Sequence, residues 1–135
     1  LLPLYCVAVA GATLDAAAIA AFVPLMLVVT ANLLATTWPD RAADAAVGKR
    51  TLATRWQPAS LRRLFAALAA ASTTLLAAGL LAWPPVVAVA GLSAVPLLIV
   101  GLAWYTHRES PLPTVAAMLW LLVAQLVGWA LVALR

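Results

Sequence analysis

The chain has 135 residues, of which 67% are hydrophobic and only 9% are charged, and its mean hydropathy is +1.09. A soluble domain carries about a quarter charged residues, so this composition excludes an ordinary soluble domain and indicates an integral membrane protein. The net charge of +4 does not indicate nucleic-acid binding, because no nucleic-acid motif is present. The single cysteine, Cys6, argues against both a disulfide framework and a thiol metal site.

Residues 1–12 form the first apolar segment, which is too short to cross roughly 30 Å of hydrocarbon, a distance that needs about 20 residues. We expect this partial transmembrane helix to be the end of a helix that begins upstream, so that the chain is the C-terminal part of a longer protein. Asp15 is then positioned to cap the next helix. Residues 16–37 are long enough to span the membrane, and Pro24 predicts a kink in that helix.

Residues 38–60, which we call the polar segment, are the only long polar stretch in the chain. Six basic residues lie in it or directly after it: Arg41, Lys49, Arg50, Arg55, Arg62 and Arg63. Such a cluster is typical of the cytoplasmic side of a membrane protein. Three further spans follow, at residues 61–83, 86–106 and 114–134, with a kink predicted at Pro96.

Alternation of the spans places residues 107–111 on the same side as the polar segment. Seven of the eight basic residues, all but Arg135, then share one face of the membrane. The sequence therefore predicts an all-α fold, a polytopic transmembrane helical bundle that forms a single membrane domain. We expect it to be a multi-pass protein of the plasma membrane of a prokaryote, with the polar segment in the cytoplasm.

Two carboxylates open the polar segment at a spacing of one helical turn. If Pro39 begins a helix, Asp40 lies in its first turn and Asp44 follows on the same face. Carboxylates so placed repel each other, so a cation between them is favourable. Mg²⁺ suits this position, because it binds through one or two carboxylates plus phosphate oxygens and keeps several waters.

The residues that follow the carboxylates suit a phosphate group. Gly48 is typical of the left-handed residue that ends a short helix, and Lys49 and Arg50 come directly after it. Arginine grips phosphate oxygens with a planar fork, while lysine adds a point charge. The stretch is therefore predicted to bind a magnesium diphosphate. The alternative is that Asp40 and Asp44 are a helix cap and a solvated helix face.

Four other polar residues remain to be interpreted. An asparagine within a membrane usually hydrogen-bonds to another helix, which is one interpretation of Asn32. Because Asn32 precedes the carboxylates on the same helix, it is also a candidate diphosphate ligand. Gln125 either joins two helices or lines a substrate cavity. His107 and Glu109 lack further ligand spacing, so we expect a solvated turn there.

The pattern Asp-x-x-x-Asp-x-x-x-Gly-Lys-Arg-Thr-Leu-Ala, from Asp40 to Ala53, resembles the second aspartate-rich motif of the UbiA-type intramembrane prenyltransferases. We call these residues the aspartate motif. The resemblance implies a bundle of nine transmembrane helices in two similar halves, each with one such motif at a cytoplasmic loop. This chain would be the second half, and it is expected to be incomplete as an enzyme on its own.

The resemblance also implies an enzyme that transfers a prenyl chain from an allylic polyprenyl diphosphate to an aromatic, quinone-precursor-like or lipid acceptor within the membrane. Mg²⁺ is the implied cofactor. Asp40 and Asp44 would be the catalytic metal ligands, and Lys49, Arg50 and Asn32 would bind the diphosphate. Expected partners are this diphosphate, the acceptor and membrane lipids, but no nucleic acid.

A non-enzymatic membrane scaffold or transporter segment is the alternative, with a basic loop that only sets topology. It explains the hydropathy equally well, but it does not explain two Asp residues one turn apart directly before Gly-Lys-Arg-Thr-Leu.

Overall fold

The computed structural model describes residues 16–134, so the partial helix expected at residues 1–12 and the cap expected at Asp15 lie outside the described part. Within residues 16–134 all regular secondary structure is helical, which confirms the predicted all-α class. The helices are α2 (Ala16–Thr37), α3 (Arg41–Ala46), α4 (Leu52–Arg55), α5 (Pro58–Ala82), α6 (Pro85–Leu92), α7 (Val95–Trp104) and α8 (Leu112–Ala133).

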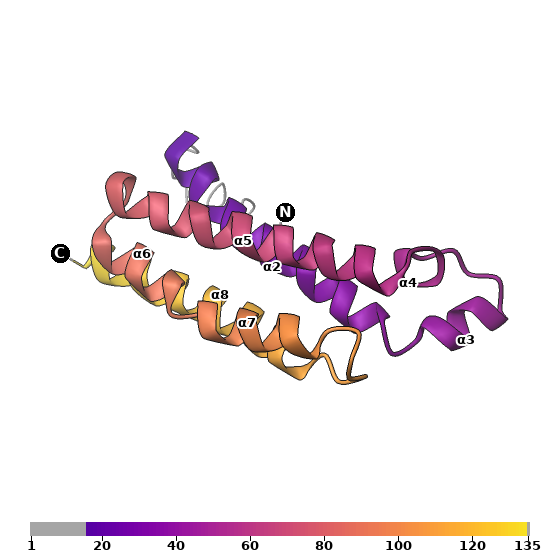
Figure 1. The fold of residues 1–135 in the computed structure, drawn as a ribbon. Coiled ribbons are helices and arrows are strands. Elements are labelled where there is room, and N and C mark those ends of the chain that lie inside the picture. The colour runs from indigo at the N-terminus through magenta and orange to yellow at the C-terminus, as the bar shows by residue number, and fades with distance from the viewer. Residues whose placement is uncertain (1–15, 135) are drawn as a thin grey trace.

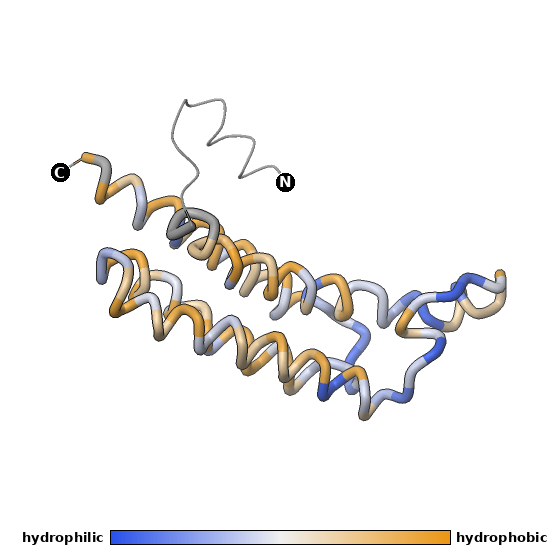
Figure 2. Tube along the Cα trace, turned by 90° about the horizontal axis from the view of Figure 1, so that it is seen from above, coloured by the Kyte–Doolittle hydropathy of each residue, from blue (hydrophilic) through white to orange (hydrophobic). Residues whose placement is uncertain are grey.

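Four stretches of the described chain are long and apolar enough to cross a membrane, namely Ala20–Thr37, Pro58–Ala82, Pro85–Trp104 and Leu112–Val132. The protein is therefore an integral membrane protein. In Figure 1 the long helices run side by side, and α3 and α4 lie beyond one end of the bundle. The same end carries the most hydrophilic part of the trace in Figure 2. The helical bundle thus holds the polar segment at one of its ends.

Two of the spans begin earlier than the sequence ranges suggested. Helix α5 starts at Pro58 and not at residue 61, because proline suits the first turn, where an N–H would have no partner within the helix. Helix α8 starts at Leu112 and not at residue 114, again with a proline, Pro113, in its first turn. Helix α2 covers residues 16–37. The polar segment is consequently shorter than expected and partly helical.

The span expected at residues 86–106 is divided into α6 and α7 by a turn at Ser93 and Ala94. Pro96 lies in the first turn of α7 and has no N–H to donate to the Leu92 carbonyl, so an uninterrupted helix would lose that bond. The Ser93 hydroxyl accepts a hydrogen bond from the indole of Trp120 in α8, at 2.8 Å. The expected kink is therefore a two-residue turn between two helices, in which Ser93 and Ala94 keep right-handed helical φ and ψ angles.

Helix α2 packs against α5 and α8, while α6 and α7 both pack against α8. Two glycines let these last helices approach closely. A Cβ at Gly128 would lie 3.1 Å from the Cα of Val87, and a Cβ at Gly101 would lie 2.8 Å from the Oγ1 of Thr114. The two halves of the broken span therefore form one wall against α8.

Two buried apolar clusters hold the bundle together. The central cluster joins the middle of the helices and consists of Leu25, Val28, Leu76, Ala94, Leu98, Ala117 and Leu121. The loop-end cluster consists of Ala31, Leu34, Ala35, Trp38, Leu61, Phe65 and Tyr105. Because Trp38 directly precedes the Pro39-Asp40 pair, the loop-end cluster fixes the place where the polar segment leaves the bundle.

Candidate functional site

Helix α3 carries both carboxylates of the aspartate motif. It begins at Arg41, so Pro39 precedes the helix and Asp40 is its N-cap residue. The Asp40 side chain makes no capping hydrogen bond and the residue is exposed, while its backbone carbonyl accepts the N–H of Asp44 at 2.8 Å. The Asp40 carboxylate therefore does not serve as a cap, and it remains open to another ligand.

Asp44 is the one buried charged residue of α3, with 9% of its surface exposed. Its Oδ1 accepts a hydrogen bond from the Lys49 ammonium at 3.0 Å, whereas its Oδ2 is buried without a hydrogen-bond partner. A buried charged oxygen without a partner costs free energy. A carboxylate that is half paired in this way is suited to receive a second cation.

Gly48 brings Lys49 back to Asp44. Its φ of +72° lies in the left-handed region, as the sequence predicted for the end of the helix, and the backbone N–H of Lys49 then donates to the Asp44 carbonyl at 2.9 Å. The Lys49 side chain is still 60% exposed, and Arg50 is exposed directly after it. Lys49, which pairs with Asp44, is therefore largely exposed, and Arg50 is a second exposed cation next to it in sequence.

Helix α4 anchors the end of the aspartate motif. Thr51 and Thr54 form a reciprocal capping box, in which each side chain bonds the backbone N–H of the other, at 3.2 and 2.9 Å. The Thr54 hydroxyl also lies 3.2 Å from the Lys49 carbonyl. Sequence reasoning missed this box, because the usual signal has Glu or Gln at the third position and not Thr.

Arg41 ties α3 to the rest of the bundle. One guanidinium nitrogen donates to the Trp38 carbonyl at 2.8 Å, the guanidinium stacks 4.1 Å from the centre of the Trp38 ring, and it pairs with Glu109 at 3.5 Å. We expected Glu109 to lie in a solvated turn, and it is exposed, yet it contacts the helix that holds both carboxylates. The only sequence signal was that Glu109 is the remaining acid on the side predicted to be cytoplasmic.

Tyr105 packs under the polar segment. Its ring lies 6.1 Å from that of Trp38 and 5.1 Å from that of Phe65, and its carbonyl accepts a hydrogen bond from the Arg62 guanidinium. Its hydroxyl is buried without a hydrogen-bond partner, and desolvation by this burial raises the pKa of Tyr105 to about 12. The Tyr105 side chain therefore stays protonated at physiological pH.

Asn32 lies on α2, the helix that precedes the aspartate motif. Its amide donates to the sulfur of Met118 in α8 at 3.5 Å, and its Oδ1 is buried without a partner. The contact that the structure shows for Asn32 is therefore between two helices, and its diphosphate role stays a prediction.

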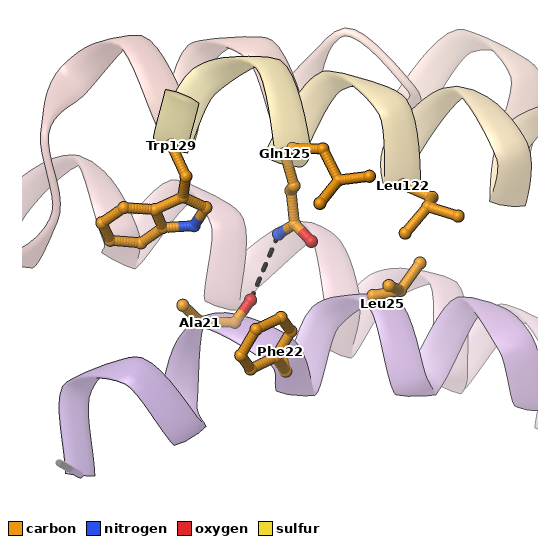
Figure 3. Close-up of a pocket in the computed structure, with 7 residues that line it drawn as sticks. Ala21, Phe22, Leu25, Leu122, Gln125 and Trp129 are labelled. Atoms are coloured by element: carbon orange, nitrogen blue, oxygen red, sulfur yellow. Dashed lines mark hydrogen bonds between the residues drawn. The ribbon is translucent and has the colours of Figure 1, made fainter. Parts of the chain in front are cut away.

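The sequence left two roles open for Gln125, either a link between two helices or a place in the lining of a substrate cavity. In the structure Gln125 joins two helices and also lines a cavity. Its Nε2 donates to the Ala21 carbonyl of α2 at 3.2 Å. Figure 3 shows this bond inside an otherwise apolar cavity of about 280 Å³ between α2 and α8. The cavity is lined by Ala21, Phe22, Leu25, Leu122, Gln125, Leu126 and Trp129.

Mg²⁺, the metal that the sequence implied, binds to proteins mainly through carboxylate oxygens. Among residues 16–134 no group of three or more His, Cys, Asp or Glu side chains is placed to hold a metal ion. Mg²⁺ does not require such a group, since it takes one or two carboxylates and completes its shell with phosphate oxygens and waters. The unpartnered Oδ2 of Asp44 and the uncapped carboxylate of Asp40 fit that kind of site.

Fold and site together define a polytopic helical membrane protein with a carboxylate and cation cluster at one end of its bundle. The sequence profile of the UbiA prenyltransferase family matches residues 1–123, and the chain belongs to this family of membrane prenyltransferases. A search of curated proteins and a search of solved structures each give no significant match.

Proposed function

We propose that the protein takes part in the magnesium-dependent transfer of a prenyl chain from an allylic polyprenyl diphosphate to an aromatic, quinone-precursor-like or lipid acceptor within the membrane. Family membership supports prenyl transfer in general. The single observation that carries the finer proposal is the half-paired, buried carboxylate of Asp44, whose Oδ1 binds the Lys49 ammonium while its Oδ2 has no hydrogen-bond partner.

In this proposal Asp40 and Asp44 hold Mg²⁺ through their carboxylates. Magnesium, when bound, offsets the charge that develops on the leaving diphosphate. The remaining ligands would be diphosphate oxygens, waters and the first aspartate-rich motif, which the family resemblance places in the other half of the bundle. Asp40 is exposed whereas Asp44 is buried, so Asp40 would meet the incoming ion first and Asp44 would hold it more rigidly.

Lys49 would pair with Asp44 in the absence of substrate and with the diphosphate in its presence. Without substrate it neutralises Asp44, which lowers the cost of burying that carboxylate. With substrate, its flexible and largely exposed side chain swings to a diphosphate oxygen, while Arg50 grips the same group with its planar fork. Both cations would then stabilise the departing diphosphate, which takes the electron pair of the broken carbon–oxygen bond.

The remaining product of that cleavage is an allylic cation, which an electron-rich acceptor captures by forming a new carbon–carbon or carbon–heteroatom bond and then losing a proton. Water must be kept away from this cation. The apolar cavity between α2 and α8, and a second one lined by alanines of α5 opposite α7, offer dry space for hydrocarbon chains.

The test of this proposal is the initial rate of prenyl transfer by the full-length protein, measured in detergent across a magnesium titration with an allylic diphosphate and a panel of phenolic acceptors. Asp44→Asn keeps the size of the side chain but removes the charge that holds the ion, so turnover should fall by orders of magnitude. Lys49→Ala should weaken diphosphate binding instead, and excess magnesium should not rescue it.

Two controls accompany this assay. Asp15→Asn removes an acid that the sequence places on the other side of the membrane, and Arg63→Gln removes an exposed cation outside the aspartate motif. Both should keep near wild-type rates. If Asp44→Asn also turns over at a near wild-type rate, the metal-site proposal is wrong and the basic loop serves only topology or scaffolding.

A further inference from the structure

The turn between α7 and α8, residues 105–111, contacts the polar segment and the start of α5, and the proposed reaction uses neither contact. Glu109 pairs with Arg41 of α3 at 3.5 Å. On the other side of the aspartate motif in sequence, Arg62 at the start of α5 donates to the Tyr105 carbonyl. One short turn thus contacts both α3, within the aspartate motif, and the start of α5.

The Arg41–Glu109 pair is exposed, and most exposed ion pairs contribute little because two long side chains must be ordered to form them. Here the arginine is already ordered. The Trp38 carbonyl accepts one of its N–H groups at 2.8 Å, and the Trp38 ring stacks against it at 4.1 Å. Glu109 therefore meets a guanidinium whose position is fixed, so less entropy is lost on pairing.

The backbone of the turn is strained in a way that serves this contact. Thr106 has a φ of +66°, a left-handed conformation that is rare for a β-branched residue. The N–H groups of both His107 and Arg108 then donate to the Trp104 carbonyl, each at 2.9 Å. This tight reversal folds the chain back at the end of α7, and Glu109 follows it directly. Strain of this kind persists only where surrounding contacts impose it.

Helix α3 needs such a contact. It has six residues, and an isolated helix of that length is not stable in water. Its orientation must therefore come from contacts to other elements. Arg41 is its first residue and lies one turn before Asp44, so a fixed Arg41 sets the rotation of the helix and with it the direction of the Asp44 carboxylate.

We propose that Glu109 is a positioning residue which, through Arg41, holds α3 in the orientation that presents Asp44 to the metal diphosphate. The proposal rests on the proposed function, but its structural half does not depend on activity. Glu109 itself touches neither substrate nor metal in this account.

Binding of magnesium pyrophosphate to the detergent-solubilised protein, followed by titration calorimetry, tests the functional half. Glu109→Gln should raise the Kd by about twofold to fivefold, the range expected for one ordered surface pair. Arg41→Gln should do the same, and the double variant should lose no more than either single variant, because both remove one interaction. Glu109→Asp keeps the charge and should fall between wild type and Glu109→Gln.

Arg108→Gln is the matched control, because Arg108 lies in the same turn but stacks on Trp104 and not on α3. Its Kd should equal that of the wild type. A wild-type Kd for Glu109→Gln, or additive losses in the double variant, would overturn the positioning role.

A distance measurement separates this inference from the proposed function. Spin labels are placed on the exposed positions Ala45→Cys of α3 and Leu112→Cys of α8, in a protein with Cys6→Ala. We expect one narrow distance distribution, which Glu109→Gln broadens and Arg108→Gln leaves unchanged. An unchanged distribution in Glu109→Gln overturns the inference. If the wild type fails to bind magnesium pyrophosphate, the proposed function fails, and this distance still decides whether Glu109 positions α3.

Discussion

The middle of the bundle and its loop end differ in the hydrogen bonding of their buried polar groups. In the middle, the buried Ser72 hydroxyl donates to the Pro24 carbonyl at 3.0 Å, and the buried Gln125 amide donates to the Ala21 carbonyl. The loop end holds Asp44 and Tyr105 with buried oxygens that have no partner, and Asn32 on the same side of the central cluster has another. Both backbone positions with positive φ, Gly48 and Thr106, also lie at this end of the described chain.

This difference indicates where stability and where function reside. Unsatisfied polar groups inside a membrane protein cost free energy, so a fold keeps them only where another requirement outweighs that cost. The satisfied middle provides a rigid scaffold. Under the proposed function, the unsatisfied end is preorganised for the metal and the diphosphate.

The topology prediction has an all-or-none outcome. Cysteines placed at Ser60 and Ser110, in a protein with Cys6→Ala, should both react with a membrane-impermeant reagent from the cytoplasmic side only. Leu81→Cys, at a position that is 94% exposed at the other end of α5, should react only from the opposite side. Labelling of Ser60 and Ser110 from opposite sides would contradict the arrangement in which the polar segment and the α7–α8 turn share one membrane face.

The next largest effect concerns Asp40. Asp40→Asn should lower turnover by orders of magnitude, like Asp44→Asn, and the double variant should cost little more than either single variant, because ligands of one metal act as a unit. Initial rates at saturating magnesium measure this. If instead the two losses multiply, the two carboxylates act independently and the shared-ion account is wrong.

A smaller effect is expected at Gly48. Nothing lies within 4 Å of the position that a Cβ would take there, so Gly48→Ala should suffer only from its left-handed backbone, which costs about 1 kcal/mol. Since this turn returns Lys49 to Asp44, the Kd of magnesium pyrophosphate should rise severalfold. Gly48→Asn is the matched variant, because asparagine enters the left-handed region more readily and should bind better than Gly48→Ala. Equal binding by both variants would show that the left-handed conformation of residue 48 does not affect binding of magnesium pyrophosphate.

The smallest predicted changes are in the free energy of unfolding, and they should have opposite signs in the middle of the bundle and at its loop end. Ser72→Ala removes a satisfied bond between helices and should destabilise the protein by about 0.6 kcal/mol. Tyr105→Phe removes a buried hydroxyl that has no partner and should stabilise it by up to about 1 kcal/mol. Thermal unfolding in detergent measures both. Changes of the same sign in the two variants would contradict the difference between the middle of the bundle and its loop end.

Tyr105 also predicts a pH dependence. Its folded-state pKa is raised from 10.0 to about 12, so the folded state binds this proton more tightly than the unfolded state does. The free energy of unfolding is therefore unaffected by ionisation of Tyr105 below about pH 10, and it falls as the pH rises toward 12. The melting temperature of the wild type should fall over that range more steeply than that of Tyr105→Phe.

Much of the fold was predictable from the sequence, because apolar stretches of spanning length leave a transmembrane helix as the solution. The break at Ser93 was predicted only as a kink, since a lone Pro96 does not reveal that Trp120 of another helix would stabilise a separated turn. Helices α5 and α8 begin a few residues before the span ranges of 61–83 and 114–134 for a different reason. Pro58 and Pro113 lie just before the apolar runs, where hydropathy does not count them, although proline fits a first turn.

The site was predictable only in its local part. The left-handed Gly48 follows from short-range spacing along one segment. The contacts of Arg41 with Glu109 and of Asn32 with Met118 join residues far apart in the chain, and no local pattern specifies such pairs. The burial of Asp44 depends likewise on how α3 is held against the bundle.

Metal retention tests the central claim most directly. Mn²⁺ serves as a probe for magnesium, because it favours the same octahedral oxygen ligands. Wild-type protein, Asp44→Asn and Arg63→Gln are dialysed to equilibrium against Mn²⁺ pyrophosphate, and the manganese retained with the protein is measured by electron paramagnetic resonance. We predict that wild type and Arg63→Gln retain manganese to the same extent, and that Asp44→Asn retains almost none. Equal retention by all three proteins would contradict the claim that Asp44 is a metal ligand.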